Sequence, residues 1–351
     1  MRPSASSNGQ PLIRAEGIWK IFGRNADKVV GTPDADLPRS ELRAKTGCVA
    51  AVRDVSFEVM PGEVFVVMGL SGSGKSTLVR TLIRLIEPTA GRIELDGRDV
   101  TAASHDELLQ LRRHTSSMVF QHFGLLAHRT VLDNVAFGLE VQGVSKAQRH
   151  ARAAEILKLV GLEDAASQFP SELSGGMQQR VGLARAFAVD PKVLLYDEPF
   201  SALDPLIRRD MQDEVVRLQE ETGKTTVFIT HDLPEALRLG DRIAIMRDGR
   251  IVQLGTPEDL VGSPADEYVE NFVRDIPRSH VLTLRWIMRD ATPSEEGGPR
   301  LDVRTTIKDA IPVIASSELP VAAVENGNVV GVVDRVAALN AIAGEGESAA
   351  A

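Results

Sequence analysis

The 351 residues of the chain suffice for two or three domains, and a hydrophobic fraction of 43% can supply their cores. The net charge of −9 argues against a nucleic-acid partner held by bulk electrostatics. Cys48 is the only cysteine, which excludes an intramolecular disulfide and fits a reducing compartment. No run reaches the roughly 18 to 20 apolar residues of a membrane span, and residues 1–10 carry no apolar signal region. We therefore expect the chain to need a separate membrane partner in any membrane process.

The pattern of apolar residues predicts strands and helices that alternate along most of the chain, after a disordered N-terminus over 1–11. Strands are predicted over 12–22, 50–59, 64–68, 92–95, 117–120, 193–196, 226–230 and 242–247. Helices are predicted over 39–45 (within a polar insertion, 24–47), from 78 onward, over 106–113 and through most of 130–172, with breaks at Gly143 and Gly161. The alternation from residue 174 onward indicates a parallel sheet.

The composition changes after Phe272, and residues 291–299 are typical of a flexible linker. Further on, Asn326-Gly327 between two β-branched runs is a strong hairpin signal. The elements expected here are strands over 321–324 and 329–333, a helix over 335–342 and a frayed end over 344–351. The sequence therefore predicts a small α+β unit over 276–351.

A glycine-rich loop, GLSGSGKST at 69–77, follows a predicted buried strand and precedes a helix. It fits the pattern G-x-x-x-x-G-K-[ST] of the phosphate-binding P-loop, in the context that the motif requires. Gly72 and Gly74 let the backbone curl so that successive N–H groups point at one anion, and the positive end of the helix adds to that field. Lys75 can reach the β- and γ-phosphates, and the Ser76 hydroxyl can ligate Mg²⁺.

Two later segments add to this motif. LSGGMQQR at 173–180 begins a helix with a Ser-Gly-Gly N-terminus suited to phosphate. The apolar strand at 193–196 ends in two acids, Asp197 and Glu198. Alone, each pattern has an ordinary explanation, a helix cap or a solvated strand end. In this order after the P-loop, they resemble the ATP-binding cassette (ABC) ATPases, in which 173–180 corresponds to the signature motif.

The resemblance implies an α/β fold class, a P-loop ABC ATPase. Its parts are a RecA-like parallel sheet core, an antiparallel β subdomain and an α-helical signature subdomain. The expected ATPase domain covers 12–275, with the helical subdomain at about 122–190. The tail, 276–351, resembles a single CBS-type module that departs from its family pattern, because Ala337 stands where an acid is usual. Either a regulatory role or dimer stabilisation fits such a degenerate tail.

The resemblance also implies ATP and Mg²⁺ as cofactors. Asp197 would hold Mg²⁺ together with Ser76 and Gln121. Glu198 would be the catalytic base, since it follows the Mg²⁺ ligand directly. His231, after the strand at 226–230, would be the switch histidine, and Gln121 the Q-loop glutamine. The implied ATP-binding residues are Phe22, Gly69, Ser71, Gly72, Ser73, Gly74, Lys75, Ser76 and Thr77.

One chain cannot easily bring both phosphate-binding motifs to the same nucleotide. The family's solution is a head-to-tail homodimer with two ATP molecules between P-loop and signature. The residues expected to act in trans are Ser174, Gly175, Gly176 and Gln178 of the signature and Asp204 of the D-loop. Phe22 would stack on adenine, with Trp19 as a rival.

Several segments narrow the resemblance to the ATP-binding subunits of glycine betaine/proline-type osmolyte importers: Lys20–Gly23, Lys45–Gly47, His128–Leu139 and Pro199–Arg208. This implies that ATP hydrolysis powers import of a quaternary ammonium compatible solute, glycine betaine or proline betaine. The implied partners are a second copy, an integral membrane permease and an extracytoplasmic solute-binding protein, with no nucleic acid. The implied location is the cytoplasmic face of the inner (plasma) membrane.

Alternatives remain at this stage. Choline and histidine importers use similar subunits. DNA-repair relatives carry a long coiled coil between P-loop and signature, and residues 69–174 leave no room for one. Translation-type relatives carry two cassettes in one chain, whereas this sequence has one P-loop and one signature.

Overall fold

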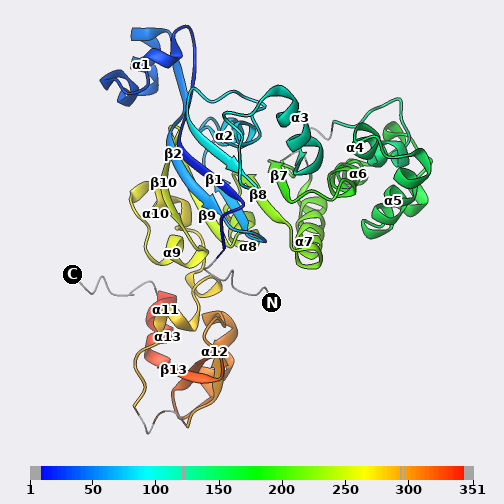
Figure 1. The fold of residues 1–351 in the computed structure, drawn as a ribbon. Helices are drawn as coiled ribbons and strands as arrows, with labels where there is room; N and C mark the ends of the chain where they lie inside the picture. The colour runs from blue at the N-terminus through cyan, green and yellow to red at the C-terminus, as the bar shows by residue number, and fades with distance from the viewer. Residues whose placement is uncertain (1–8, 121–123, 202, 293–294, 296, 344–351) are drawn as a thin grey trace. The chain divides into compact units, whose positions relative to one another are not determined.

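The computed structural model describes residues 9–120, 124–201, 203–292, 295 and 297–343 (Figure 1). The chain divides into two compact units, residues 1–252 and 253–351. Gln121, most of the predicted disordered N-terminus and the frayed C-terminus lie outside the described residues. In the part of the chain that is described, no helix has both the length and the apolar character that a membrane crossing requires.

A four-stranded antiparallel sheet begins the first unit, in the order β2-β1-β4-β5. Its strands are β1 (Ile13–Phe22), β2 (Val49–Val59), β4 (Ala90–Leu95) and β5 (Arg98–Asp99). In the register, Ile13 lies opposite Val59 on one side and Leu95 on the other. The predicted antiparallel subdomain is confirmed, with a turn at Asp96-Gly97 in which both residues have positive φ.

The core of this unit is a six-stranded sheet in the order β10-β9-β3-β8-β7-β6. Its strands are β3 (Val64–Met68), β6 (Ser116–Val119), β7 (Val193–Asp197), β8 (Thr225–Thr230), β9 (Arg242–Arg247) and β10 (Arg250–Gly255). The four pairings among β6, β7, β8, β3 and β9 are parallel. Every residue of β3, β7 and β8 is buried, as expected for strands covered on both faces. The predicted parallel core is thus confirmed.

Helices cover the sheet and form a separate helical layer (Figure 1). Those of the first unit are α1 (Arg39–Thr46), α2 (Lys75–Leu82), α3 (His105–His114), α4 (Val131–Val141), α5 (Lys146–Leu159), α6 (Gly175–Ala188), α7 (Pro205–Thr222) and α8 (Leu233–Leu239). The helical layer consists of α4, α5 and α6, which pack on one another. Gly143 and Gly161, at φ 84° and 64°, interrupt this layer where the sequence predicted breaks.

The polar insertion folds as a compact cap at the ends of β1 and β2. It contains two 3₁₀ turns, Ala26–Lys28 and Pro33–Asp36, and then α1. Val29, Ala35 and Leu42 share a small core with residues of β1 and β2. Arg53, buried on β2, donates hydrogen bonds to the carbonyls of Ala35 and Leu37, which fixes the insertion to the sheet.

The second unit begins with α9 (Pro257–Gly262) and α10 (Glu267–Val273) and continues with α11 (Leu284–Ile287), β11 (Arg300–Asp302), α12 (Ile307–Ser316), β12 (Val321–Glu325), β13 (Asn328–Val333) and α13 (Arg335–Ala343). Its sheet has the order β11-β12-β13. The predicted hairpin is confirmed, because β12 and β13 are antiparallel around Asn326-Gly327. The expected end of the ATPase domain at residue 275 stays a prediction.

Candidate active site

Parallel pairing places the predicted motifs at one edge of the core sheet. Met68, which ends β3, pairs with Thr230 at the end of β8, and Asp197 at the end of β7 pairs with Ile229. The residues that follow these strands, the P-loop, Glu198 and His231, therefore emerge side by side. This is the edge at which ligands bind in open α/β sheets.

The P-loop wraps around the ammonium of Lys75, which is only 4% exposed. Its Nζ donates hydrogen bonds to the carbonyls of Gly69 at 2.9 Å and Leu70 at 3.3 Å. The same Nζ lies 3.4 Å from Oε1 of Glu198. A buried cation is thus held at the N-terminus of α2, where the helix dipole also favours an anion.

The backbone of the loop requires glycine. Gly72 and Gly74 have φ of 79° and 108°, in the region that side chains disfavour. A Cβ on Gly74 would also lie 2.1 Å from the carbonyl oxygen of Ala51. Between these glycines, the Ser73 hydroxyl is buried and has no hydrogen-bond partner among the described residues. An unpartnered donor beside Lys75 and a helix N-terminus fits a phosphate group.

Glu198 lies between a cation and an imidazole. Its Oε1 faces Lys75, and its Oε2 is 3.2 Å from Nδ1 of His231. Glu198 has φ of 47°, a left-handed conformation that costs free energy in a non-glycine residue. The carboxylate is mostly buried, whereas the imidazole is half-exposed. A carboxylate held in this way can accept a proton from a water molecule at the open side of the site.

Asp197 is 2% exposed and is paired with Arg80, a residue that the sequence analysis did not single out. Arg80 donates from Nε at 3.0 Å and from Nη2 at 2.8 Å to the same oxygen, Oδ2. Arg80 lies on α2 four residues after Ser76, so both project from one face of the helix. That spacing was the available signal for this contact.

The signature residues are bonded locally. Ser174 caps α6 by accepting a hydrogen bond from the backbone N–H of Met177. Gln178 donates to the carbonyls of Pro170 and Leu173. Among the described residues, no hydrogen bond or ion pair links 174–178 with the P-loop. The structure of one chain does not bring the two phosphate-binding motifs together.

Two glycines of the signature have different surroundings. A Cβ on Gly175 would meet nothing within 4 Å, whereas a Cβ on Gly176 would lie 2.7 Å from Cγ2 of Ile207. Gln179, which was not predicted from the sequence, is fully buried on α6, and neither of its amide atoms is hydrogen-bonded to another described residue.

The remaining predicted residues lie in distinct environments. Phe22 is 44% exposed, with Lys20 Nζ 4.9 Å from its ring centroid. Trp19 packs instead against the small core of the insertion. Asp204 caps α7, accepting hydrogen bonds from the N–H groups of Leu206 and Ile207.

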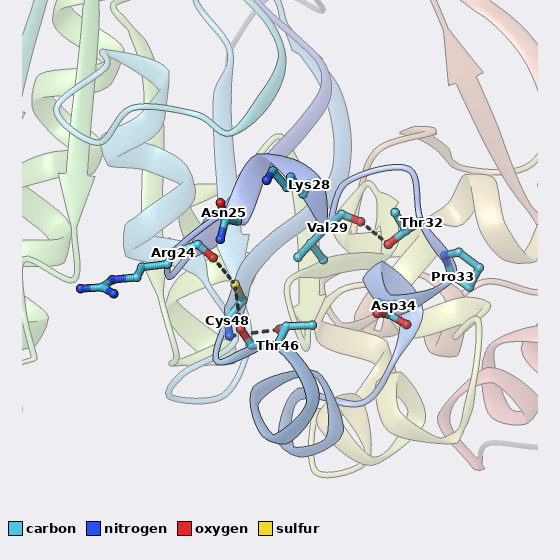
Figure 2. Close-up of a pocket in the computed structure, with 9 residues that line it drawn as sticks. All are labelled: Arg24, Asn25, Lys28, Val29, Thr32, Pro33, Asp34, Thr46 and Cys48. Carbon is cyan, nitrogen blue, oxygen red and sulfur yellow. Dashed lines mark hydrogen bonds between the residues drawn. The ribbon is translucent and has the colours of Figure 1, made fainter.

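A cavity of about 300 Å³ lies in the insertion and contains none of the predicted site residues (Figure 2). Some of its polar groups bond one another: Cys48 Sγ donates to the carbonyls of Arg24 and Thr46, and Thr32 Oγ1 to that of Val29. The guanidinium of Arg24 points away from it. This cavity is therefore separate from the site at the sheet edge.

Comparison with known proteins identifies the family. A model of the ABC transporter family matches residues 52–201. The glycine betaine transport ATP-binding protein OpuAA of Bacillus subtilis is 56% identical over 290 residues, which cover 82% of this chain and 69% of that protein. The trimethylamine N-oxide transport system ATP-binding protein TmoW of Ruegeria pomeroyi is 48% identical over 335 residues, 95% of this chain and 97% of that protein.

A solved structure gives the same result for the fold. The dimeric post-hydrolysis structure of the ATP-binding cassette MJ0796, bound to ADP and Pi, aligns with a TM-score of 0.59 at 32% identity. The alignment covers 70% of this chain and 98% of that one. The chain therefore belongs to the family of ABC transporter ATP-binding proteins, and it is a nucleotide-binding ATPase.

Proposed function

We propose that ATP binds at the edge of the core sheet with its phosphates in the P-loop. The unpartnered Ser73 hydroxyl and the buried Lys75 ammonium support this assignment. Gly69, Ser71, Gly72, Gly74, Ser76 and Thr77 complete the loop. Phe22, the more exposed of the two aromatic candidates, stacks on adenine.

The proposed metal is Mg²⁺, held by Ser76 and Asp197, with Gln121 as a further ligand. Among the described residues, no group of three or more His, Cys, Asp or Glu side chains could hold a metal ion. Mg²⁺ does not need three such protein ligands, because it keeps several of its waters and binds through one or two carboxylates together with substrate phosphates. When bound, the ion would neutralise charge on the phosphate oxygens.

The observation that carries the proposed hydrolysis is the position of Glu198, with Lys75 at one carboxylate oxygen and His231 at the other. Glu198 takes a proton from the attacking water, and His231 orients the γ-phosphate and that water. Glu198 directly follows Asp197 at the end of β7, and His231 follows the neighbouring strand β8. The in-trans roles of Ser174, Gly175, Gly176, Gln178 and Asp204 follow from a head-to-tail dimer, which the dimeric MJ0796 structure supports.

We propose that this ATPase powers import of a small solute with a methylated, positively charged nitrogen. The similarity to the glycine betaine transport protein OpuAA supports glycine betaine or proline betaine as the cargo. In this role the chain assembles with a membrane permease and an extracytoplasmic solute-binding protein, on the cytoplasmic face of the membrane. The binding protein would select the cargo, with an aromatic cage around the cation.

Trimethylamine N-oxide is a second candidate cargo, supported by the extent of the match to a trimethylamine N-oxide transport protein. The match to TmoW covers 97% of that protein, whereas the match to OpuAA covers 69%. The match to TmoW spans 95% of this chain and therefore extends into the tail.

Uptake by cells that lack this chain tests the proposal. Accumulation of labelled glycine betaine or trimethylamine N-oxide should be lost, and the wild-type chain should restore it. The Glu198→Gln chain should not restore it. If both uptakes are normal while histidine uptake collapses, the cargo assignment is wrong and the transport ATPase assignment stands. If choline uptake collapses instead, the class of methylated cations stands and both named cargoes are wrong.

A further inference from the structure

Glu235 is a buried acid on α8 to which the proposed hydrolysis gives no role; it is 5% exposed. Its Oε2 accepts a hydrogen bond from the hydroxyl of Thr230, the residue before His231. Its Oε1 accepts a hydrogen bond from Nε2 of Gln212, on α7, at 3.2 Å. One carboxylate therefore joins the loop that carries His231 to the helix that follows the D-loop.

A second contact joins the same two segments. Arg208, one turn before Gln212 on α7, has Nη1 3.8 Å from Oδ2 of Asp232, the residue after His231. Its Nη2 donates to the carbonyl of Leu203 at 3.1 Å. Leu203 directly precedes Asp204, so Arg208 connects the D-loop segment to the loop of His231. With contacts on both sides of His231, a shift of α7 would also move the imidazole.

The two segments also enclose a small cavity of about 10 Å³, close to the space that one water molecule needs. It is lined by Glu198, Phe200, Ser201, Arg208, Thr230, His231, Asp232 and Glu235. Glu235 thus shares a cavity with both residues proposed for hydrolysis.

We propose that Glu235 is a positioning residue for ATP hydrolysis, whose carboxylate fixes the loop of His231 to α7 so that the switch histidine and the D-loop move together. The inference rests on the proposed roles of His231 and Glu198. In the proposed dimer the D-loop meets the second subunit. Closure of the dimer is then transmitted through Gln212 and Arg208 to the histidine, and hydrolysis is coupled to assembly.

The protonation state of Glu235 sets the strength of this link. Both hydrogen bonds are donated to the carboxylate, so the anion accepts both, whereas a protonated carboxyl must donate through one oxygen. Burial, with Asp232, raises the pKa of Glu235 to about 7, against the opposing effects of Thr230, Gln212 and Arg208. The neighbouring strand β3 is apolar throughout and adds no charge. The link therefore strengthens as pH rises through about 7.

Glu235→Gln tests the inference, because the neutral amide presents an N–H to one of two donors. We expect kcat for ATP hydrolysis by the full chain to fall about tenfold, with the KM for ATP changed less than about twofold, since misplaced groups cost rate more than binding. Glu220→Gln, at an exposed glutamate on α7, is the matched control and should keep wild-type kcat.

The double variant Glu235→Gln/Gln212→Glu exchanges the two side chains across the same contact. It restores a carboxylate–amide pair, so it should recover most of the lost kcat. Such a recovery of kcat would distinguish a positioning role from a general loss of packing. The comparison remains informative even if the single variant has a lowered melting temperature.

The pH profile is the second readout. Part of the rise in wild-type kcat around pH 7 should be absent from Glu235→Gln, while contributions from Glu198 and His231 remain in both proteins. Wild-type kcat and pH profile in Glu235→Gln, or a double variant no better than the single one, would overturn the inference. Unchanged turnover in Glu198→Gln would instead contradict the proposed site, so the two failures are distinguishable.

Discussion

Arg80 donates two hydrogen bonds to one carboxylate oxygen of Asp197, the proposed magnesium ligand. Asp197 is 2% exposed, so its charge needs a partner in the protein when no metal is bound. Arg80, whose side chain is 42% exposed, supplies that charge. In the proposed site, Mg²⁺ and Arg80 would therefore interact with the same carboxylate.

Arg80→Met should destabilise the magnesium-free protein. Removing Arg80 leaves the buried charge of Asp197 without a partner. Because the guanidinium is partly exposed to solvent, we expect the free energy of unfolding to fall by only about 1–3 kcal/mol. Chemical denaturation without nucleotide measures this. Mg²⁺ with ATP should stabilise the variant more than the wild type, because the ion neutralises Asp197. Arg152→Met, which removes an exposed helical ion pair, is the control and should change stability by less than about 0.5 kcal/mol. Equal effects of the two substitutions would contradict this account of Arg80.

Gly175→Asp should block ATP-dependent dimerisation without unfolding the chain. A Cβ at Gly175 meets nothing within 4 Å, and an acid in the first turn of α6 is favourable for the helix. In the proposed dimer the added charge faces the γ-phosphate of the ATP held by the other subunit. Gly175→Ala adds the Cβ without the charge and should dimerise nearly normally. Size-exclusion chromatography with ATP distinguishes them, and dimerisation of Gly175→Asp at wild-type ATP concentrations would contradict the sandwich.

The stability of the first unit should fall as pH rises toward 7. Burial raises the pKa of Glu235 from its ordinary value of 4.5 to about 7 in the folded chain. Between these values the folded state keeps a proton that the unfolded state has released. The proton on Glu235 therefore contributes fully to the free energy of unfolding below about pH 4.5, and this contribution is lost as the pH rises through about 7. The total loss is up to about 3 kcal/mol. Urea denaturation at pH 5 and pH 8 measures this difference. The free energy of unfolding should fall more between the two pH values for wild type than for Glu235→Gln, and equal decreases would contradict the raised pKa of Glu235.

Gly262→Ala should destabilise the second unit and spare ATP hydrolysis. Gly262 ends α9, and a Cβ there would lie 2.1 Å from Cζ2 of Trp286 in α11. Overpacking of this kind costs about 1–3 kcal/mol. The indole fluorescence of Trp286 reports local unfolding. A variant with unchanged melting would show that α9 and α11 separate easily.

The sequence was sufficient for the elements with strong local signals. The strand, P-loop and helix around Lys75 and the Asn326-Gly327 hairpin are present because glycine and apolar spacing determine them locally. The parallel core followed from the alternation of strands and helices. The sequence left Phe22 and Trp19 as rivals for adenine, and the choice of Phe22 from its greater exposure stays a proposal.

The contacts that support the site were not predictable in the same way. Arg80 bonds a strand end 117 residues further along the chain, and Gln179 is buried without a hydrogen-bond partner among the described residues, whereas Glu235 turns back to Thr230, five residues before it. The spacing of Ser76 and Arg80 places them on one helix face, but it does not by itself show that Arg80 reaches Asp197 or that Glu235 bonds Thr230. These pairings depend on the packing of the whole sheet, and only the three-dimensional register reveals them.

The most direct test of the central claim is the steady-state ATP turnover of Glu198→Gln beside that of the control Glu220→Gln. Glu198 is bracketed by Lys75 and His231, so loss of its basicity should lower turnover by more than about a hundredfold, while ATP binding persists and an ATP-bound dimer accumulates. The control should turn over ATP at the wild-type rate. Turnover of Glu198→Gln within a few-fold of wild type would contradict the proposed active site.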